Sequence, residues 1–435
     1  MKFGIFIDLQ LPRPWHEGDE ARLFHEALEQ VELADRLGID YVWVQEHHFL
    51  EEYSHSSAPE VFLAACSQRT KNIRLGHGIV VMSPKYNHPA RVAERLATLD
   101  ILSGGRVEWG TGESGSRMEL EGFGVDFVDK RPMWAEAVQE TAKMMSTNPY
   151  PGFKGKYFSM PHRNVVPKPM QRPHPPVWAA CSNRDSLNLA AKLGMGGLTF
   201  AFINAEEAKF WVDEYYETFK RECQPIAQAV NPNVSMLTGF MCHEDHDTAV
   251  ERGQEGAQFF AYGLGHYWRD GIHHPGQTDM WEAFNQRPVS VDEKLERERK
   301  KAGMSGIGNP KHLIEKFRAL EDAGVDQLIL LHQCGAYKHE HICESLQLFA
   351  AEVLPEFKER EAIREKEKAA ELAPYIAAAH RNIPSQEPMK EVPPVEAYPL
   401  MWKKMSAETS QSTPDRRPGM SAFWQMQVGG KRPKK

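Results

Sequence analysis

Short apolar runs alternate with segments of helical periodicity along most of the chain. Glu20–Leu37 repeats apolar residues at helical spacing and is followed by Gly38, which predicts a helix ending there. Runs such as Tyr41–Gln45 are too short for a helix and predict strands. The predicted strands are Phe3–Asp8, Tyr41–Gln45, Ile73–Met82, Val107–Gly112, Pro176–Cys181, Gly197–Phe200, Val234–Cys242 and Asp326–His332. The predicted helices are Glu20–Leu37, Pro59–Arg69, His88–Leu102, Arg131–Ser146, Ser186–Leu193, Ala205–Glu222 and His339–Phe357.

The repeated strand–helix order predicts an α/β fold built on a parallel sheet with helices outside. Eight such units exceed what an open, doubly wound sheet usually needs, and they favour closure into a (β/α)8 TIM barrel. The strands are apolar nearly throughout, as in Leu328–Leu331, which is expected when both faces of a parallel sheet are buried. We therefore expect a single barrel with insertions and a C-terminal extension.

Two segments interrupt this order. Residues 148–175 are rich in proline, glycine and aromatic residues, and we predict an excursion before the fifth strand. Residues 262–308 are longer and contain Tyr267, Trp268 and Trp281. A long insertion in a compact barrel is more often functional than accidental, so residues 262–308 are interpreted as a lid-like insertion. A surface decoration or a dimer contact is the alternative.

The character of the sequence changes after Phe357. We predict that residues 1–357 form the barrel and that residues 358–435 form an extension. Lys358–Arg381 is charged and helix-prone, whereas Asn382–Lys435 holds eight prolines and few aliphatic residues and is expected to be extended and partly disordered. The end of this tail is basic. It is either a solvated tail or an arm that wraps a partner subunit or docks an acidic protein, and we prefer a tail with some subunit contact.

Composition narrows the class of protein. The chain has 435 residues, 41% of them hydrophobic, which can supply a sizeable core. A net charge of −8 gives no general attraction to nucleic acid or to a membrane surface. No run approaches the roughly 20 apolar residues that span a bilayer, and residues 1–8 resemble a strand, not a signal peptide. Six scattered cysteines without a C-x-x-C pair fit a reducing compartment. We expect a cytoplasmic protein.

The chemistry of such a barrel lies at the carboxyl ends of its strands. The second strand ends in Glu46-His47-His48. Two adjacent histidines suggest a metal, but neighbouring residues at a strand end point in different directions, and no third ligand stands at a recognisable spacing. No metal is therefore expected. We assign His47 to acid–base or hydrogen-bonding chemistry and expect the adjacent Glu46 to orient it. His48 is assigned to packing under the following loop.

Two loops at strand ends have the composition of a cofactor site. Ser182, Asn183 and Arg184 stand at the turn from the fifth strand into a helix, where free backbone N–H groups and an arginine can bind a phosphate. A plain helix N-cap is the alternative. Gly110–Gly115 is glycine-rich without the spacing of a dinucleotide motif or a P-loop, and we expect it to let a flat cofactor approach the backbone.

Several motifs, in order along the chain, resemble the bacterial luciferase-like flavin monooxygenase family. The segments that carry the resemblance are Tyr41–Phe49, Asn87–Arg91, Leu102–Gly110, Pro176–Ser182, Ile307–Pro310 and Leu348–Pro355. Ordered motifs over most of a chain are more specific than any one of them. The resemblance ends at about Glu359, so the tail lies outside it.

This resemblance implies a flavin-dependent oxidoreductase. It implies that a separate flavin reductase delivers reduced FMN to the barrel mouth, and that the flavin reacts with O2 to give a 4a-hydroperoxide, which oxygenates a small substrate. By the same resemblance, Glu46 supports the flavin, His47 is the catalytic acid or base, and residues 262–308 are a mobile lid. The remaining flavin contacts that it implies are Gly78, Ile79, Val80, Gly112, Ala180, Ser182, Asn183, Arg184 and Phe200. The aromatic lid favours an apolar substrate such as an aldehyde, a ketone or a terpenoid.

The sequence also departs from the family pattern. Luciferases carry a reactive cysteine near the end of the fourth strand, where this chain has Gly112, so light emission is not expected. The next residue is Glu113, where luciferases have an arginine that contacts phosphate, and Arg184 or Arg117 is expected to compensate.

Two other functions stay open. A deazaflavin-dependent oxidoreductase of the same superfamily would move a hydride without O2, and the Glu46-His47-His48 sequence disfavours this branch. A non-enzymatic flavin-binding subunit is the second alternative, because barrels can be recruited without activity. The retained Glu46 and His47 argue against it. We expect a homodimer.

Overall fold

Eight parallel strands form the centre of the molecule. The computed structural model describes residues 1–200, 202–287, 306–383 and 389–397, and within them these strands close a barrel. Closure occurs where β1 pairs with β12, with Phe3 opposite Leu328. In barrel order the strands are β1 Lys2–Ile7, β2 Tyr41–Val44, β3 Arg74–His77, β5 Val107–Gly112, β8 Val177–Cys181, β9 Gly196–Thr199, β10 Val234–Cys242 and β12 Gln327–Leu331. The predicted (β/α)8 barrel is confirmed.

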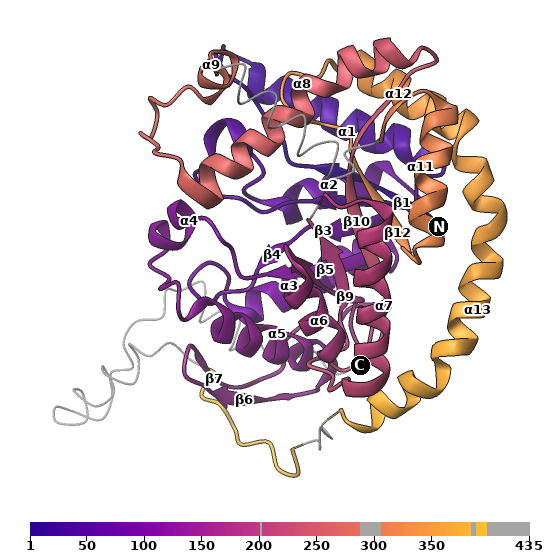
Figure 1. Cartoon of the computed structure of the whole chain (residues 1–435). Helices are drawn as coiled ribbons and strands as arrows, with labels where there is room; N and C mark the ends of the chain where they lie inside the picture. The colour runs from indigo at the N-terminus through magenta and orange to yellow at the C-terminus, as the bar shows by residue number, and fades with distance from the viewer. Residues whose placement is uncertain (201, 288–305, 384–388, 398–435) are drawn as a thin grey trace, which may run out of the picture. The chain divides into compact units, whose positions relative to one another are not determined.

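Helices surround this barrel (Figure 1). The larger ones are α1 Asp19–Leu37, α2 Pro59–Arg69, α3 Pro89–Ser103, α5 Lys130–Ser146, α6 Arg184–Lys192, α7 Ala205–Glu222, α8 His246–Gly265, α11 Pro310–Asp322, α12 His339–Glu352 and α13 Leu354–Arg381. The smaller elements are η1 Glu51–Tyr53, β4 Val80–Val81, α4 Arg117–Gly122, β6 Tyr150–Lys154, β7 Ser159–Arg163, η2 His266–Asp270, α9 Met280–Asn285 and β11 Gly306–Gly308.

The structure corrects the predicted third strand. Ile73–Met82 is not one strand, because β3 ends at His77 and the chain resumes as β4 at Val80. The backbone N–H of Gly78 still donates to the Val44 carbonyl at 2.7 Å, whereas Val80 pairs with Thr111 of β5. The chain therefore changes its neighbour between Gly78 and Val80, at the barrel mouth.

The segments between the predicted elements also contain structure. Residues 148–175 include the antiparallel hairpin β6–β7. Helices α4, α8, α9 and α11 were not predicted. The compact unit that contains the barrel extends to Pro388, so α13 belongs to it, beyond the predicted boundary at residue 357. In the second unit, residues 389–397 form neither helix nor strand. The rest of the predicted tail lies outside the described residues.

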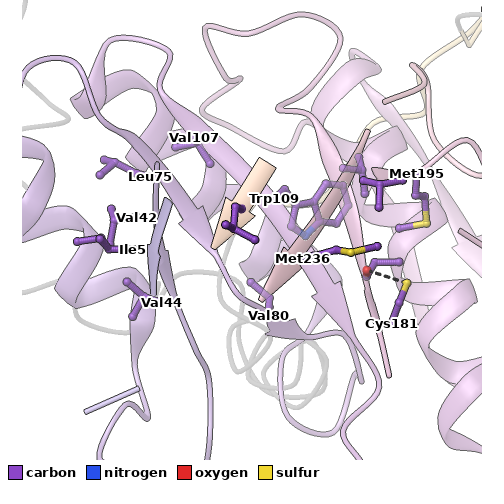
Figure 2. Close-up of a cluster of buried hydrophobic side chains, with 14 of the residues drawn as sticks. Ile5, Val42, Val44, Leu75, Val80, Val107, Trp109, Cys181, Met195 and Met236 are labelled. Carbon is purple, nitrogen blue, oxygen red and sulfur yellow. Dashed lines mark hydrogen bonds between the residues drawn. The ribbon is translucent and has the colours of Figure 1, made fainter. Parts of the chain in front are cut away.

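The outer face of each strand packs under the helices. Ile5, Val42, Val44, Leu75 and Val107 belong to this layer, which Figure 2 shows, and all are buried. Burial of one aliphatic side chain stabilises a fold by about 1.5–3 kcal/mol. The apolar strand sequences thus provide the main stabilisation of the barrel wall.

Aromatic rings fill the interior near the amino-terminal ends of the strands. Trp43 and Trp178 are buried there, and their rings cross edge to face at 5.4 Å. A Cβ at Gly76 or Gly196 would collide with one of these rings, so both positions have to be glycine. The indole of Trp178 donates to the buried Glu108 carboxylate at 2.7 Å. These side chains fill this part of the interior, and in barrels of this kind the site lies at the carboxyl ends of the strands.

Candidate active site

A cavity of about 970 Å³ lies at the amino-terminal ends of the strands, against α13. Its lining includes Lys2 and Asp326, which stand at or beside the beginnings of β1 and β12. Lys368 from α13 enters it and pairs with Asp326 at 2.6 Å. Since strand-end chemistry in these barrels is found at the opposite mouth, we assign this cavity to the packing of α13.

Glu46 fixes the backbone at the end of β2. Its buried carboxylate accepts hydrogen bonds from the Val81 backbone N–H at 2.8 Å and from the Asn87 side-chain amide at 2.8 Å. His48 Nε2 lies 3.1 Å from the same carboxylate. Glu46 thus connects β2 to β4 and to the start of α3. This places an acidic side chain beside the backbone segment that follows β3.

His47 pairs with a different acid, Glu119 of α4. His47 Nδ1 lies 3.1 Å from Glu119 Oε1, and Glu119 also accepts from the His48 backbone N–H at 2.9 Å and from the Ser114 hydroxyl at 2.7 Å. Burial favours the neutral imidazole, but the charge and hydrogen bond of Glu119 outweigh it and raise the pKa of His47. Burial likewise opposes ionisation of Glu119, yet His47 and Ser114 reverse this and lower its pKa.

The structure corrects one expectation about this group. Glu46 was expected to orient His47, but it contacts His48 instead. Successive residues of an extended chain point to opposite sides, so residues 46 and 48 share a side and residue 47 faces away from them. The partner of His47 therefore comes from another part of the chain.

Glu119 was not among the predicted site residues. It lies on a helix of six residues, too short for a periodicity signal. Ser116 stands three residues before it, and this spacing is typical of a helix start. That pattern could have located α4, but not the contact with His47, which joins residues 72 positions apart.

His48 lies among aromatic rings. Its imidazole contacts the rings of Phe123, Tyr86 and Phe49 at centroid distances of 4.9, 5.8 and 6.0 Å. This is the packing environment expected for His48. The two adjacent histidines thus have separate surroundings, one with an acid at the site and one in an aromatic cluster.

The predicted insertion covers His47. The ring centroid of Trp268 lies 5.4 Å from that of the His47 imidazole and 5.4 Å from that of Tyr53. The ring centroids of Tyr53 and His47 are 5.6 Å apart. A Cβ at Gly115 would approach Trp268 to 2.6 Å, so this glycine admits the indole. Trp268 is carried by η2, one turn of π-helix at the end of α8. Turns of this kind occur often at functional sites.

Two acids hold the insertion against the loop after β2. Buried Glu52 accepts from the backbone N–H groups of Met280 at 2.5 Å and Trp281 at 3.0 Å. Glu51 accepts from the Gly276 N–H at 2.7 Å and lies 3.2 Å from His273 Nε2. The insertion begins later than predicted, because residues 262–265 belong to α8. Residues 288–305 of it lie outside the described residues.

Small residues form one wall of the mouth. A Cβ at Gly112 would lie 2.5 Å from Ile79 and 3.6 Å from the Cβ of Ala180, so these three predicted contacts stand together. Val80 pairs with β5 next to them. Gly78 lies against the Trp43 side chain. The rings of Phe200 and Phe6 pack with their centroids 5.7 Å apart. These predicted contacts come from neighbouring strand ends at the same mouth of the barrel.

The predicted phosphate residues cap a helix. The Asn183 side chain accepts from the Ser186 N–H at 2.9 Å and forms a capping box at the start of α6. Ser182, Asn183 and Arg184 are exposed, and Arg184 pairs with Glu214 at 3.2 Å. A hollow of about 30 Å³ lies nearby, and its lining includes Gly112, Ala180, Ser186, Glu113 and Arg131.

Arg131, rather than Arg117, balances Glu113. Arg131 lies 2.7 Å from the Glu113 carboxylate, and Lys130 lies 3.6 Å from it. Arg117 is exposed and pairs with Glu121 of its own helix. The acid at this position is therefore neutralised locally by two cations of α5.

The described residues contain neither a membrane-spanning helix nor a metal-binding cluster. No helix among them is both long and apolar enough to cross a membrane. No group of three or more His, Cys, Asp or Glu side chains is placed to hold a metal ion in the described ranges. The absence of a metal from the reaction stays a prediction.

Comparison with known proteins places this geometry in a family. Residues 1–327 match the family described as luciferase-like monooxygenase. The chain is 25% identical over 378 residues to the oxygenase component of flavin-dependent trigonelline monooxygenase of Acinetobacter baylyi, covering 84% of this chain and 98% of that protein. It is 28% identical over 360 residues to limonene 1,2-monooxygenase of Rhodococcus erythropolis, covering 82% and 86%.

A solved structure agrees with these matches. Monooxygenase RslO1 of Streptomyces bottropensis superposes with a TM-score of 0.67 at 25% identity, covering 82% of this chain and all of that one. The chain spans about half, 54%, of one curated relative that it matches, an uncharacterized protein of Sinorhizobium fredii. The family match covers most of the chain and includes the barrel strands up to the start of β12. The chain is therefore an enzyme of the luciferase-like monooxygenase family.

Proposed function

We propose that this chain is the oxygenase component of a two-component flavin monooxygenase. It receives reduced FMN from a separate reductase and transfers one atom of O2 to a small apolar substrate. The observation that carries the proposal is the His47–Glu119 pair, which lies at the barrel mouth under an aromatic insertion. The trigonelline and limonene monooxygenases, matched over most of their length, support the oxygenase assignment.

The residues present fit a flat flavin. Gly112 and Ala180 are small and Ile79 packs against Gly112, so an isoalloxazine ring would lie against Ile79 and the Gly78–Val80 segment at this mouth. The N-terminus of α6, at Ser182–Arg184, would hold the phosphate. Arg131, close to Ser186 and already paired with Glu113, adds positive charge on that side. Reduced FMN bound there supplies the capacity to react with O2.

The chain's own residues would then control a proton and exclude water. His47, oriented by Glu119, can hold or release a proton at its Nε2 atom, because Nδ1 is engaged by the carboxylate. Trp268 and Tyr53 cover the imidazole and limit the approach of water. Glu46 keeps the backbone after β3 in place. We propose apolar substrates because aromatic and aliphatic residues surround this mouth.

A deazaflavin-dependent reaction is the second candidate. The chain is 25% identical over 344 residues to 5,10-methylenetetrahydromethanopterin reductase of Methanopyrus kandleri, a relative that favours this alternative. Titration of the full-length chain with reduced FMN and with a reduced deazaflavin under anaerobic conditions separates the two. Tighter binding of reduced FMN supports the proposal, whereas tighter binding of the deazaflavin would replace it.

We further propose a cytoplasmic homodimer. The neighbouring helices α2 and α3 expose apolar side chains, among them Val61 and Leu102 at 67% and 52% exposure. Light scattering of the purified chain gives its mass directly, and a mass equal to one chain of 49.5 kDa would exclude the dimer.

A further inference from the structure

A buried acid with no hydrogen-bond partner stands at the end of β1. The side chain of Asp8 is fully buried, and neither of its carboxylate oxygens has a hydrogen-bond partner among the residues that the structure describes. By strand alternation it points to the same side as Phe6, into the barrel interior. Burial of an unpartnered carboxyl group is costly, so its retention in a stable fold needs a reason.

The backbone around Asp8 is held in a strained conformation. Leu9, the next residue, has a φ of 56°, in the left-handed region that a leucine rarely adopts. Its N–H donates to Gln333 Oε1 at 3.0 Å, and its carbonyl accepts from the His55 N–H at 3.0 Å. The Ser54 hydroxyl donates to the Asp8 carbonyl at 2.7 Å. Strain of this kind persists where surrounding bonds enforce it, and it is frequent at active sites.

The charged and titratable groups that act on Asp8 belong to the site. The segment Tyr53–Ser56 joins the two residues Asp8 and His47. Ser54 donates to the Asp8 carbonyl, the Ser56 carbonyl accepts from the His47 N–H at 2.9 Å, and the Tyr53 ring contacts the His47 imidazole, so the charges of Asp8 and His47 influence each other. Burial raises the pKa of Asp8 to about 7, although His47 and the side chains of Ser54 and Gln10 oppose this and the charge of Glu119 adds to it. An ionised Asp8 in turn favours the charged imidazole of His47. Groups coupled in this way titrate as a unit.

We propose that Asp8 is a positioning residue of the active site, which acts through His47 and determines the pH at which that imidazole loses its charge. The inference rests on the proposed acid–base role of His47. When Asp8 is ionised, it and Glu119 together hold a proton on His47. When Asp8 takes up a proton, it loses the charge that favours the protonated imidazole. The two side chains therefore share one proton over an extended pH range.

Asp8→Asn tests the inference without cofactor or substrate. The variant is isosteric and removes the cost of ionising a buried carboxyl group, so it should unfold at or above the wild-type temperature. In full-length protein with isotope-labelled histidine rings, we expect the His47 signal, assigned by its loss in His47→Gln, to titrate at lower pH. Its curve should lose the second inflection that reports Asp8. Asp8→Ala should shift it in the same direction.

Two controls and one contrary result complete the design. Asp245→Asn changes an exposed helix cap and should leave the His47 titration unchanged. The His48 signal should stay the same in every variant, because His48 contacts Glu46. An unaltered His47 titration in both Asp8 variants overturns the inference, and so does an Asp8→Asn variant that fails to fold. Because turnover is not measured, failure of the monooxygenase proposal would leave this result interpretable.

Discussion

The two adjacent histidines differ because they face opposite sides of the chain. His47 points to Glu119 and the mouth of the barrel, whereas His48 points to Glu46 and an aromatic cluster. Nothing in their sequence separates them, since both follow the same strand and both stand near an acid. The distinction arises only when α4 brings Glu119 to one of them.

His47→Ala should therefore impair chemistry more than folding. A positioned acid or base usually contributes about 10²–10⁴-fold, so we expect turnover to fall by roughly that factor with reduced-FMN binding retained. His48→Ala is the matched variant, and it should lower the melting temperature with a smaller effect on turnover. Steady-state turnover and thermal melts of both variants check this. If His48→Ala loses the turnover and His47→Ala keeps it, the two roles are reversed.

The His47–Glu119 pair should also stabilise the fold in a limited pH window. The pKa of Glu119 lies below its ordinary value of 4.5, so its contribution is present above pH 4.5 and is lost as the pH falls through the folded-state pKa. The pKa of His47 lies above 6.5, so its contribution is full below pH 6.5 and is lost as the pH rises through the folded-state pKa.

Glu119→Gln makes this window measurable. The difference in unfolding free energy between wild type and variant should be largest between pH 4.5 and 6.5. Urea unfolding at a series of pH values gives this difference. A difference that stays constant with pH would mean that the pair carries no charge interaction.

At the scale of elements, the insertion after α8 depends on Glu52. This buried carboxylate accepts three backbone N–H groups, those of Arg13, Met280 and Trp281. It joins the start of α9 to the loop after β2, beside Tyr53, and Tyr53 contacts both His47 and Trp268. The position of Trp268 over the site is thus coupled to an acid that does not touch the site.

Glu52→Ala should release the insertion after α8 from its position over His47. Backbone donors that lose a buried acceptor cost about 1–3 kcal/mol of stability, so the insertion should leave its position over His47. We therefore expect NADH consumption by the coupled system to yield hydrogen peroxide in place of product. Glu282→Ala, an exposed acid of α9, is the control and should leave coupling unchanged. A peroxidase assay alongside NADH absorbance measures both. Unaltered coupling in Glu52→Ala would refute the role of the insertion as a cover.

The sequence predicted the regular elements better than the site's connections. The barrel strands are apolar on both faces, so short runs such as those around Val42 and Leu330 indicated them directly. Helix α11 was overlooked although Asn309 and Pro310 form a typical helix start. The break between β3 and β4 and the contact of Trp268 with His47 depend on tertiary pairing, which no local pattern reports.

At the scale of the whole molecule, α13 contributes to the barrel unit. Lys358 pairs with Asp40, Lys368 with Asp326, and Arg360 with Glu321, which also accepts the N-terminal amine at 2.9 Å. These pairs join the end of the unit to the amino-terminal ends of its strands. The helix is therefore expected to stabilise the barrel rather than to take part in its chemistry.

Two truncations distinguish these roles. A chain ending at Phe357 loses all three pairs and should melt lower by about 5 °C or more. A chain ending at Ile383 keeps them and should melt with the full-length protein. Calorimetry of the three chains checks this. Equal melting temperatures for all three would show that α13 is dispensable.

The central claim is that the chain inserts one atom of dioxygen into an organic substrate by means of reduced FMN. The most direct measurement supplies the full-length protein with FMN, a flavin reductase, NADH and a panel of apolar aldehydes, ketones and terpenoids under isotopically labelled dioxygen. The account predicts a product that carries one labelled oxygen atom and depends on FMN. Product formed without dioxygen from a reduced deazaflavin, with no label in it, would contradict the account.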